Sequence, residues 1–212
     1  MEGRLEVVGD PSNPATLLGA DGITYEKVIV VGDTAEIVMN ECVISGFSGL
    51  YYTLLYTGAD LGGIYKSGGM TPTFEMTNCL VKDNQKKLIS GNLASMTINN
   101  SSFLGNVISD STANTVLSCD CLHTFTVKNS SFQGGGGINA GHGGVIENNT
   151  FIGNPIGFRH ALVNILSFER GVGGGVVLPF NDITVRNNSF TNNTGGDTAA
   201  RRYSLPRHHG VV

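Results

Sequence analysis

The sequence has no tryptophan, only six prolines and few charged residues, which make up 14% of its 212 positions. Low charge together with 40% hydrophobic residues excludes a wholly disordered chain, because enough apolar surface is present to form a core. The net charge of −4 disfavours nucleic acid as a partner, since binding to phosphates needs an excess of Lys and Arg. No apolar run approaches the roughly 20 residues of a membrane-spanning helix, so we expect no transmembrane segment.

Cysteine is also scarce, with four residues at Cys42, Cys79, Cys119 and Cys121. Cys119 and Cys121 are too close together for a zinc-binding pair, and no second pair accompanies them. We therefore expect buried free thiols, while a disulfide between two of the four is left open by the sequence. The glycine run 134–137 is not a phosphate loop, because no Lys-Ser/Thr follows it. We predict no metal ion and no cofactor.

Glycine, in contrast, is abundant, with 30 residues, about twice its usual share. Abundant glycine together with many Asn, Ser and Thr residues indicates tight turns between short strands. No amphipathic stretch is long enough to predict a helix. The composition therefore predicts an all-β fold with no helical domain.

A short phrase recurs six times in the sequence: an apolar residue, any residue, Asn, any residue, a small or apolar residue, and an apolar residue. Its asparagines are Asn40, Asn78, Asn100, Asn129, Asn148 and Asn187. Its final apolar residues are Val43, Val81, Phe103, Phe132, Phe151 and Phe190. Six positions after each asparagine stands another turn residue, either Gly or Asn. Because all six matches keep the same internal spacing, we interpret them as equivalent positions in a repeated structural unit.

Successive asparagines of the phrase are 38, 22, 29, 19 and 39 residues apart. A period near 20 residues predicts a right-handed, single-stranded parallel β-helix of about 7–9 coils, covering residues 1–197. The two long intervals are expected to hold an extra coil or a loop, with 50–56 and 161–166 as candidate strands. The β-rich opening, at 5–8, 15–18 and 28–31, is expected to belong to the same solenoid.

Each column of the repeat has a predicted structural role. Side chains alternate between the two faces of a strand, so the apolar ends of the phrase should point into a common core. The column from Val43 to Phe190 is then one internal stack. Asparagine suits the turn because it tolerates the left-handed backbone conformation, and its amide can bind the asparagine one coil away. All twelve residues are therefore predicted to be structural rather than catalytic.

Residues 198–212 are predicted to form a basic tail beyond the solenoid. The candidate partner-binding residues in it are Arg201, Arg202, Arg207, His208 and His209. A solvated end is the simpler interpretation, and docking on an acidic partner is the alternative. Because solenoid ends expose core and strand edges, we expect other subunits or further chain to cover them.

The repeats resemble the polymorphic membrane protein type of autotransporter passenger domain, whose coils carry a Phe-x-x-Asn motif and a Gly-Gly-Ala-(Ile/Leu/Val) motif. Full matches to the first motif begin at Phe103, Phe151 and Phe190, and 62–64, 143–145 and 174–176 approximate the second without its alanine. The resemblance covers most of the chain, as coils, and no outer-membrane barrel is present in it. It implies a right-handed β-helix with a structural or adhesive role at the cell surface or outside the cell.

An enzymatic alternative comes from Gly141-His142-Gly143, which matches a polygalacturonase motif, with Asp120 about one coil upstream. An inverting glycosidase needs a pair of carboxyl groups, and that family's other motifs are missing. Pectate-lyase chemistry would need clustered acids for Ca²⁺, whereas the aspartates here are scattered. An ice-binding solenoid would need rows of outward threonine, and threonine does not recur in the register of the phrase. His142 is better interpreted as a turn residue.

The sequence thus favours a non-catalytic structural or adhesive module that presents a ladder surface for protein or glycan binding, as part of a larger surface protein or assembly. A carbohydrate-active β-helix enzyme of the polygalacturonase or lyase kind is the first alternative. An intracellular scaffold subunit of a large complex is the second. Fold resemblance by itself does not decide among these functions.

Overall fold

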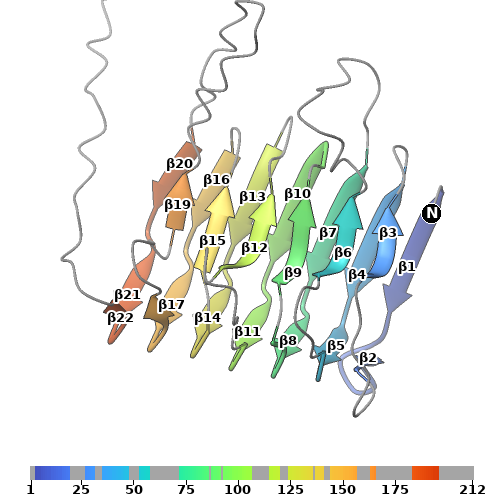
Figure 1. Ribbon diagram of the computed structural model, residues 1–212, viewed down its shortest axis with the longest axis horizontal. Coiled ribbons are helices and arrows are strands. Elements are labelled where there is room, and N and C mark those ends of the chain that lie inside the picture. The colour runs from blue at the N-terminus through green and yellow to red at the C-terminus, as the bar shows by residue number, and fades with distance from the viewer. Residues whose placement is uncertain are drawn as a thin grey trace, which may run out of the picture.

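A computed structural model of the protein describes residues 3–19, 27–31, 35–47, 53–57, 72–85, 87–91, 93–106, 115–119, 124–135, 137–140, 144–156, 163–165 and 183–195. The ordered elements among these residues are all β-strands, and most of them belong to three parallel sheets. Figure 1 shows the strands stacked in chain order, from β1 at the right of the view to β20 at the left.

The first and second sheets have seven strands each. The first sheet contains β1 (Arg4–Val8), β4 (Glu36–Asn40), β7 (Thr73–Thr77), β10 (Ser95–Asn99), β13 (Thr124–Lys128), β16 (Gly144–Glu147) and β20 (Ile183–Arg186). The second sheet contains β2 (Ala15–Leu18), β5 (Cys42–Ser45), β8 (Leu80–Lys82), β11 (Ser102–Leu104), β14 (Ser131–Gln133), β17 (Thr150–Ile152) and β21 (Ser189–Thr191).

The third sheet has six strands. They are β3 (Lys27–Val31), β6 (Thr53–Thr57), β9 (Lys87–Gly91), β12 (Thr115–Cys119), β15 (Gly137–Ala140) and β19 (Val163–Ile165). A short parallel pair, β18 (Pro155–Ile156) and β22 (Thr194–Gly195), accompanies the last two coils.

Each of the first six coils passes once through the three sheets, and the seventh is described in the first two. β4, β5 and β6 form one coil, and their neighbours in the next coil are β7, β8 and β9. All pairings between named strands are parallel, and every coil pairs only with the coils before and after it. The described residues therefore form a parallel β-helix of seven coils, which confirms the predicted fold class.

The core lies between the sheets and is filled by alternate residues of each strand. In the first sheet Ile37, Phe74, Met96 and Phe125 occupy one aligned inward position, and all are buried. The alternate residues of these strands face outward and are partly or fully exposed. Full burial of one such side chain stabilises the fold by about 1.5–3 kcal/mol. The alternation of apolar and polar residues in each strand is therefore what places the core inside the coil.

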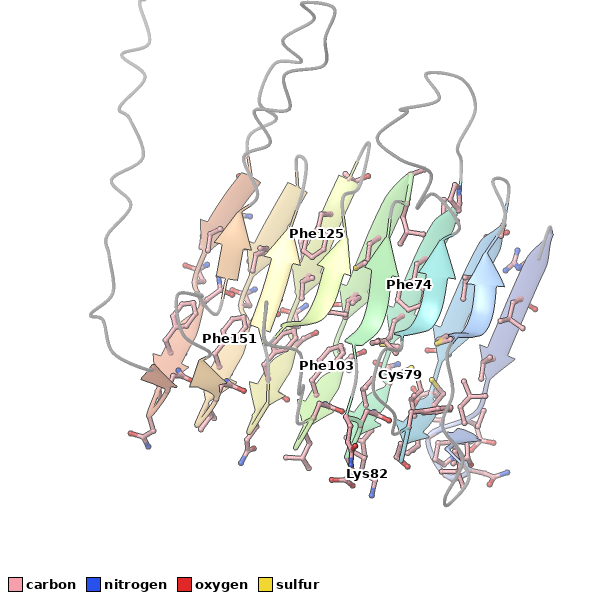
Figure 2. The ribbon with its side chains drawn as sticks, viewed as in Figure 1. Phe74, Cys79, Lys82, Phe103, Phe125 and Phe151 are labelled. Atoms are coloured by element: carbon pink, nitrogen blue, oxygen red, sulfur yellow. The ribbon has the colours of Figure 1, made fainter. Side chains whose placement is uncertain are left out.

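A column of phenylalanines fills the interior behind the second sheet. The ring centroids of Phe103 and Phe132 are 4.6 Å apart, those of Phe132 and Phe151 4.8 Å, and those of Phe151 and Phe190 4.9 Å. These distances match the spacing of about 4.8 Å between neighbouring strands. Figure 2 shows Phe103 and Phe151 inside the coils. Val81 pairs with Phe103 and extends the column by one coil. The predicted internal stack is confirmed from Val81 to Phe190.

The expectation of an extra coil in the long intervals is wrong. β4 pairs directly with β7 across the first long interval, and β16 pairs directly with β20 across the second. The candidate strands in these intervals are β6 and β19, which are third-sheet strands of their own coils. A coil inserted between β4 and β7 would separate their hydrogen-bonded backbones, so none is present there.

The opening segment is part of the solenoid, as predicted, because β1, β2 and β3 pair with β4, β5 and β6. The turn between β1 and β2 is held by the Asp10 carboxylate, which accepts hydrogen bonds from the backbone N–H groups of Ser12 and Asn13 and from the Ser12 hydroxyl. At the other end, the inward residues Val185 and Phe190 are 42% and 51% exposed. The stack is thus less enclosed at its last described coil than in its middle.

Candidate interaction surface

The asparagine corner joins the first-sheet strand to the second-sheet strand in the five coils from β7 to β20. Its members have a positive φ between 49° and 56° and exposed side chains; they are Asn78, Asn100, Asn129, Asn148 and Asn187. The backbone must take the left-handed conformation here so that the chain turns within one residue, and asparagine tolerates this conformation better than most residues. The predicted turn role is confirmed for these five residues.

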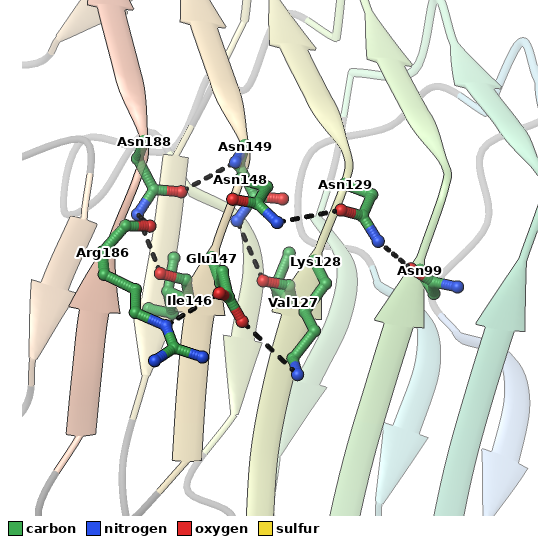
Figure 3. Close-up of polar contacts among 10 residues, drawn as sticks. All are labelled: Asn99, Val127, Lys128, Asn129, Ile146, Glu147, Asn148, Asn149, Arg186 and Asn188. Carbon is green, nitrogen blue, oxygen red and sulfur yellow. Dashed lines mark hydrogen bonds and ion pairs between the residues drawn. The ribbon is translucent and has the colours of Figure 1, made fainter.

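Side-chain hydrogen bonds connect much of the asparagine corner along the solenoid axis. The Asn100 amide donates to Asn78 Oδ1 at 2.6 Å, and the Asn148 amide donates to Asn129 Oδ1 at 3.3 Å. The Asn129 amide instead donates to Asn99 Oδ1, at the end of β10, at 2.8 Å. Figure 3 shows this part of the ladder running across three neighbouring coils. The predicted amide-to-amide ladder is therefore present but changes partner at Asn129.

The predicted register of the first repeat is wrong by one residue. Asn40 lies within β4 opposite Thr77, and Glu41 takes the positive-φ corner position with φ 50°. Val43 correspondingly pairs with Leu80 and faces outward, while Ile44 pairs with Val81 and is buried. The sequence is ambiguous here because 38 and 39 are both apolar, as are 43 and 44. A one-residue shift exchanges the two faces of a strand, so the core selects the register that buries Ile44.

A column of small buried side chains directly follows the asparagine corner and was not predicted. Its members are Cys42, Cys79, Ser101, Ser130, Asn149 and the partly buried Asn188. From Ser101 onward, each member accepts a hydrogen bond from the backbone N–H of the member one coil before it, as in Cys79 N–H to Ser101 Oγ and Ser101 N–H to Ser130 Oγ, both at 3.2 Å. The signal in the sequence is the small residue after every corner residue.

The serines of this column also donate hydrogen bonds within their own coil. Ser101 Oγ donates to the Asn99 carbonyl at 3.0 Å, and Ser130 Oγ donates to the Lys128 carbonyl at 2.7 Å. In the later coils Asn149 donates to the Val127 carbonyl of the preceding coil at 2.9 Å. Buried polar groups are costly unless they are paired, so the column satisfies backbone groups that the sharp corner leaves without strand partners.

A second buried asparagine column lies at the next turn, at Asn84, Asn106, Asn154 and the partly buried Asn193. Their amides donate to carbonyls of the preceding coil, for example Asn154 to Phe132 and Asn193 to Phe151, both at 2.9 Å. The column is interrupted by Gly135, where a Cβ would lie only 1.9 Å from the Asn106 carbonyl oxygen. The asparagines predicted as turn residues six positions after the phrase asparagines are thus internal supports of the coil, whereas Gly46 is exposed.

One regular outward surface is formed by β7, β10 and β13, and we call it the hydroxyl face. Its side chains form three rows along the axis: Thr73, Ser95 and Thr124; Glu75, Thr97 and Thr126; and Thr77, Asn99 and Lys128. The aligned hydroxyls correct the expectation that threonine does not recur in register. Neighbouring side chains stand about 4.8 Å apart across strands and about 6.6 Å apart along a strand. Glu75 and Lys128 distinguish the array from one made of threonine alone.

An ion-pair ladder borders the hydroxyl face on its C-terminal side (Figure 3). Arg186 Nε lies 2.7 Å from Glu147 Oε1, and Lys128 Nζ lies 3.5 Å from Glu147 Oε2. These three residues are paired neighbours in β13, β16 and β20. The hydrogen bond from Arg186, with a smaller contribution from Lys128, lowers the pKa of the Glu147 carboxyl below its ordinary value. Glu147 is therefore ionised at neutral pH and connects two cations.

Several candidate residues lie outside the described part of the chain. They are the tail residues Arg201, Arg202, Arg207, His208 and His209, together with His142 and Asp120 of the enzymatic alternative. Among the described residues, no group of three or more His, Cys, Asp or Glu side chains is placed to hold a metal ion. The same residues contain no helix long and apolar enough to cross a membrane.

Comparisons of the chain with family models, with curated proteins and with solved structures give no match. The class of protein is therefore defined by its own geometry, as a parallel β-helix with stacked asparagine and phenylalanine columns.

Proposed function

We propose that the chain is a non-catalytic structural or adhesive module whose hydroxyl face binds protein or glycan surfaces. The observation that carries the proposal is the register of this face, where hydroxyl, amide and charged side chains of three coils align in rows. Hydroxyls and amides both donate and accept hydrogen bonds, as do the hydroxyl groups of a glycan. Rows of repeated donors and acceptors suit an extended ligand better than a small molecule, which is usually bound in a concave pocket.

The fold supports this proposal by holding the face rigid. Behind the hydroxyl face the inward residues Phe74, Met96 and Phe125 are fully buried, so the strands that carry the face cannot rotate independently. Preorganised groups lose little conformational entropy on binding, which matters when each contact is weak. When an extended ligand makes several weak hydrogen bonds along the solenoid axis at once, the linked contacts together give a higher affinity than any one of them.

The resemblance to polymorphic membrane protein passengers also supports an adhesive role, with display at the cell surface or outside the cell as part of a larger protein or assembly. The structure gives its Phe-x-x-Asn motif a physical meaning in this chain. Phe103 and Phe151 belong to the internal phenylalanine column, and Asn106 and Asn154 belong to the second buried asparagine column. The motif residues therefore build the coil, which leaves the outward residues of the hydroxyl face free to define a ligand.

Binding is best tested with two matched variants, Thr126→Glu and Ser131→Glu. Both residues are half-buried hydroxyl residues of the same coil, but Thr126 lies on the hydroxyl face and Ser131 lies on the outer side of the second sheet. The labelled wild-type protein is applied to arrays of glycans and of extracellular-matrix and cell-surface proteins. We expect Thr126→Glu to lose at least tenfold in affinity for the ligands found and Ser131→Glu to lose less than twofold.

Two results would contradict the proposal. The first is equal loss of binding in the two variants, which would mean that the hydroxyl face is not the contact surface. The second is release of reducing ends from uronic-acid polysaccharides by the wild type but not by His142→Ala, which would establish the enzymatic alternative. The module proposed here has no such activity, so His142→Ala leaves the signal at background.

For the basic tail we propose a separate role as a contact to an acidic partner. Residues 198–212 contain Arg201, Arg202 and Arg207 but no acidic residue. Each exposed ion pair contributes at most about 1 kcal/mol, so several must act together. Deleting 200–212 should leave the melting temperature unchanged and weaken assembly, with the largest difference from the wild type at low salt, because added salt already screens the ion pairs of the wild type. Unfolding of the solenoid on deletion would show instead that the tail caps the last coil.

A further inference from the structure

Cys42 and Cys79 lie side by side in the small buried column, one coil apart. Both are free thiols and are almost completely buried, and their sulfur atoms are 2.8 Å apart. Val43 and Leu80 directly follow the two cysteines and pair with each other, which places Cys42 opposite Cys79. The sulfurs face one another because the column has a single inward direction at this corner. Figure 2 shows Cys79 inside the coil, near the N-terminal end of the stack.

The neighbouring hydrogen bonds indicate which of the two thiols donates to the other. Cys79 Sγ donates to the Thr77 carbonyl at 3.2 Å, which repeats the bond that Ser101 Oγ makes to Asn99 one coil later. The Cys42 thiol is then the donor to Cys79 Sγ, and this bond together with burial raises the pKa of the Cys42 thiol. The same bond lowers the pKa of the Cys79 thiol, whereas the burial of both sulfur atoms limits the access of reagents in the folded, reduced protein.

The geometry points to Cys42 and Cys79 as a disulfide site that joins two neighbouring coils when the chain folds under oxidising conditions. Disulfide formation requires opposed cysteines whose Cα atoms are about 4.4–6.8 Å apart, a range that includes the spacing of about 4.8 Å between paired strands. The sulfur atoms need to approach by less than 1 Å to reach the bonded separation of about 2.05 Å. Small side-chain rotations provide this movement, so the coil does not have to change its register.

The oxidant is a low-molecular-weight disulfide such as oxidised glutathione. One cysteine thiolate attacks a sulfur of this disulfide, which forms a mixed disulfide and releases one glutathione thiolate. The second cysteine, after losing its proton, attacks the sulfur of the first, so that the Cys42–Cys79 bond forms and the second glutathione leaves. The two protons from the cysteines end on the two glutathione thiols. A glutathionyl group does not fit in the fully packed column, so the exchange takes place before this coil closes.

The linkage would stabilise the folded chain by restricting the unfolded one. A bond from Cys42 to Cys79 closes a loop that contains 43–78. In the chain-entropy model a loop of this length raises the melting temperature of a domain of this size by about 10 °C. The crosslink would also fasten the coil of β4 and β5 to that of β7 and β8, close to the open N-terminal end. This site goes beyond the proposed binding function and does not depend on it.

Peptide mapping after refolding tests the site directly. The reduced, denatured wild-type chain is diluted into a buffer of reduced and oxidised glutathione, its free thiols are alkylated, and it is digested with trypsin. Cys42 lies in peptide 28–66, Cys79 in peptide 67–82, and Cys119 and Cys121 together in peptide 88–128. We expect peptides 28–66 and 67–82 to be joined, with a mass lower than their sum by two hydrogen atoms.

Two variants provide the controls. Cys42→Ser retains a small hydrogen-bonding group, as at Ser101, and should abolish both the linked peptides and the difference in melting temperature between oxidised and reduced refolding. Cys119→Ser should preserve both. The site is refuted if folded wild-type protein yields Cys42 and Cys79 alkylated, glutathionylated or linked to other cysteines. It is also refuted if the chain folds in reducing buffer but not in glutathione buffer. Because the wild-type map is decisive alone, failure of Cys42→Ser to fold leaves the test intact.

Discussion

Replacing Phe151 by alanine should strongly destabilise the solenoid, because this ring occupies the middle of the phenylalanine column. Phe151 is 0% exposed and stacks on Phe132 and Phe190, with ring centroids 4.8 and 4.9 Å away. Removing a fully buried phenylalanine costs about 3–5 kcal/mol, which includes both the lost transfer free energy and the cavity left behind. The neighbouring coils are fixed by backbone hydrogen bonds, so the cavity cannot close by a simple collapse.

Phe190 provides the matched control, because it has the same residue type, column and strand position. It is 51% exposed and, within the described part of the chain, stacks on Phe151 alone. About half of its surface is already in contact with water, so Phe190→Ala should cost about 1 kcal/mol. The difference between the two variants is then about 2–4 kcal/mol.

Equilibrium unfolding in urea, followed by the far-ultraviolet circular dichroism of the β-sheets, measures this difference. The slope of free energy against urea must be similar in the variants for the comparison to hold, since a changed slope indicates a change in the denatured or native state. Equal destabilisation by Phe151→Ala and Phe190→Ala would refute the buried column. A loss below about 1 kcal/mol for Phe151→Ala would do the same, because such a value is typical of a partly exposed ring.

Three further substitutions address the polar columns and the ion-pair ladder. Asn154→Ala leaves the buried Gly135 N–H without its acceptor and removes the amide hydrogen bond to the Phe132 carbonyl, so urea unfolding should show a loss of about 2–4 kcal/mol; a loss below about 1 kcal/mol would contradict that role. Gly135→Asn would place a Cβ against Asn106, so it should lower the melting temperature, and a rise would show that the coil can accommodate it. The lowered pKa of Glu147 implies a stabilising contribution that is complete above the ordinary carboxyl pKa of about 4.3 and is lost as pH falls through the lower folded value. The difference in urea midpoint between wild type and Glu147→Gln should therefore be larger at pH 7 than in strong acid, and an unchanged difference would argue against the ion pair.

The phrase predicted the fold because it spans the sharpest corner of the coil, where the sequence is most constrained. The corner needs a residue that tolerates positive φ, flanked by inward apolar residues on two strands, and Asn148 between Ile146 and Phe151 meets both needs. Five of the six repeats show this pattern without ambiguity. The first does not, because Glu41 replaces asparagine and the neighbouring Asn40 imitates the phrase one position too early.

The third sheet and the buried polar columns were harder to predict. The connection from the second to the third sheet varies in length, from Ser45 to Thr53 in one coil and from Gln133 to Gly137 in another, so no fixed spacing reveals β6 or β15. The small buried column changes from cysteine to serine to asparagine along the axis. These residues share a size and a hydrogen-bonding role rather than a chemical class, and such a pattern becomes visible only when the coils are aligned in space.

Chemical-shift mapping tests most directly whether the outside of the solenoid is its working surface. The isotopically labelled protein is titrated with the tightest ligand found on the arrays, and backbone amide and methyl shifts are followed by NMR. The shifts should cluster at Glu75, Thr97 and Thr126, which are paired neighbours on the outer side of β7, β10 and β13. Shifts clustered instead at Ser131 on the second sheet, or around His142, would contradict a binding role for the hydroxyl face.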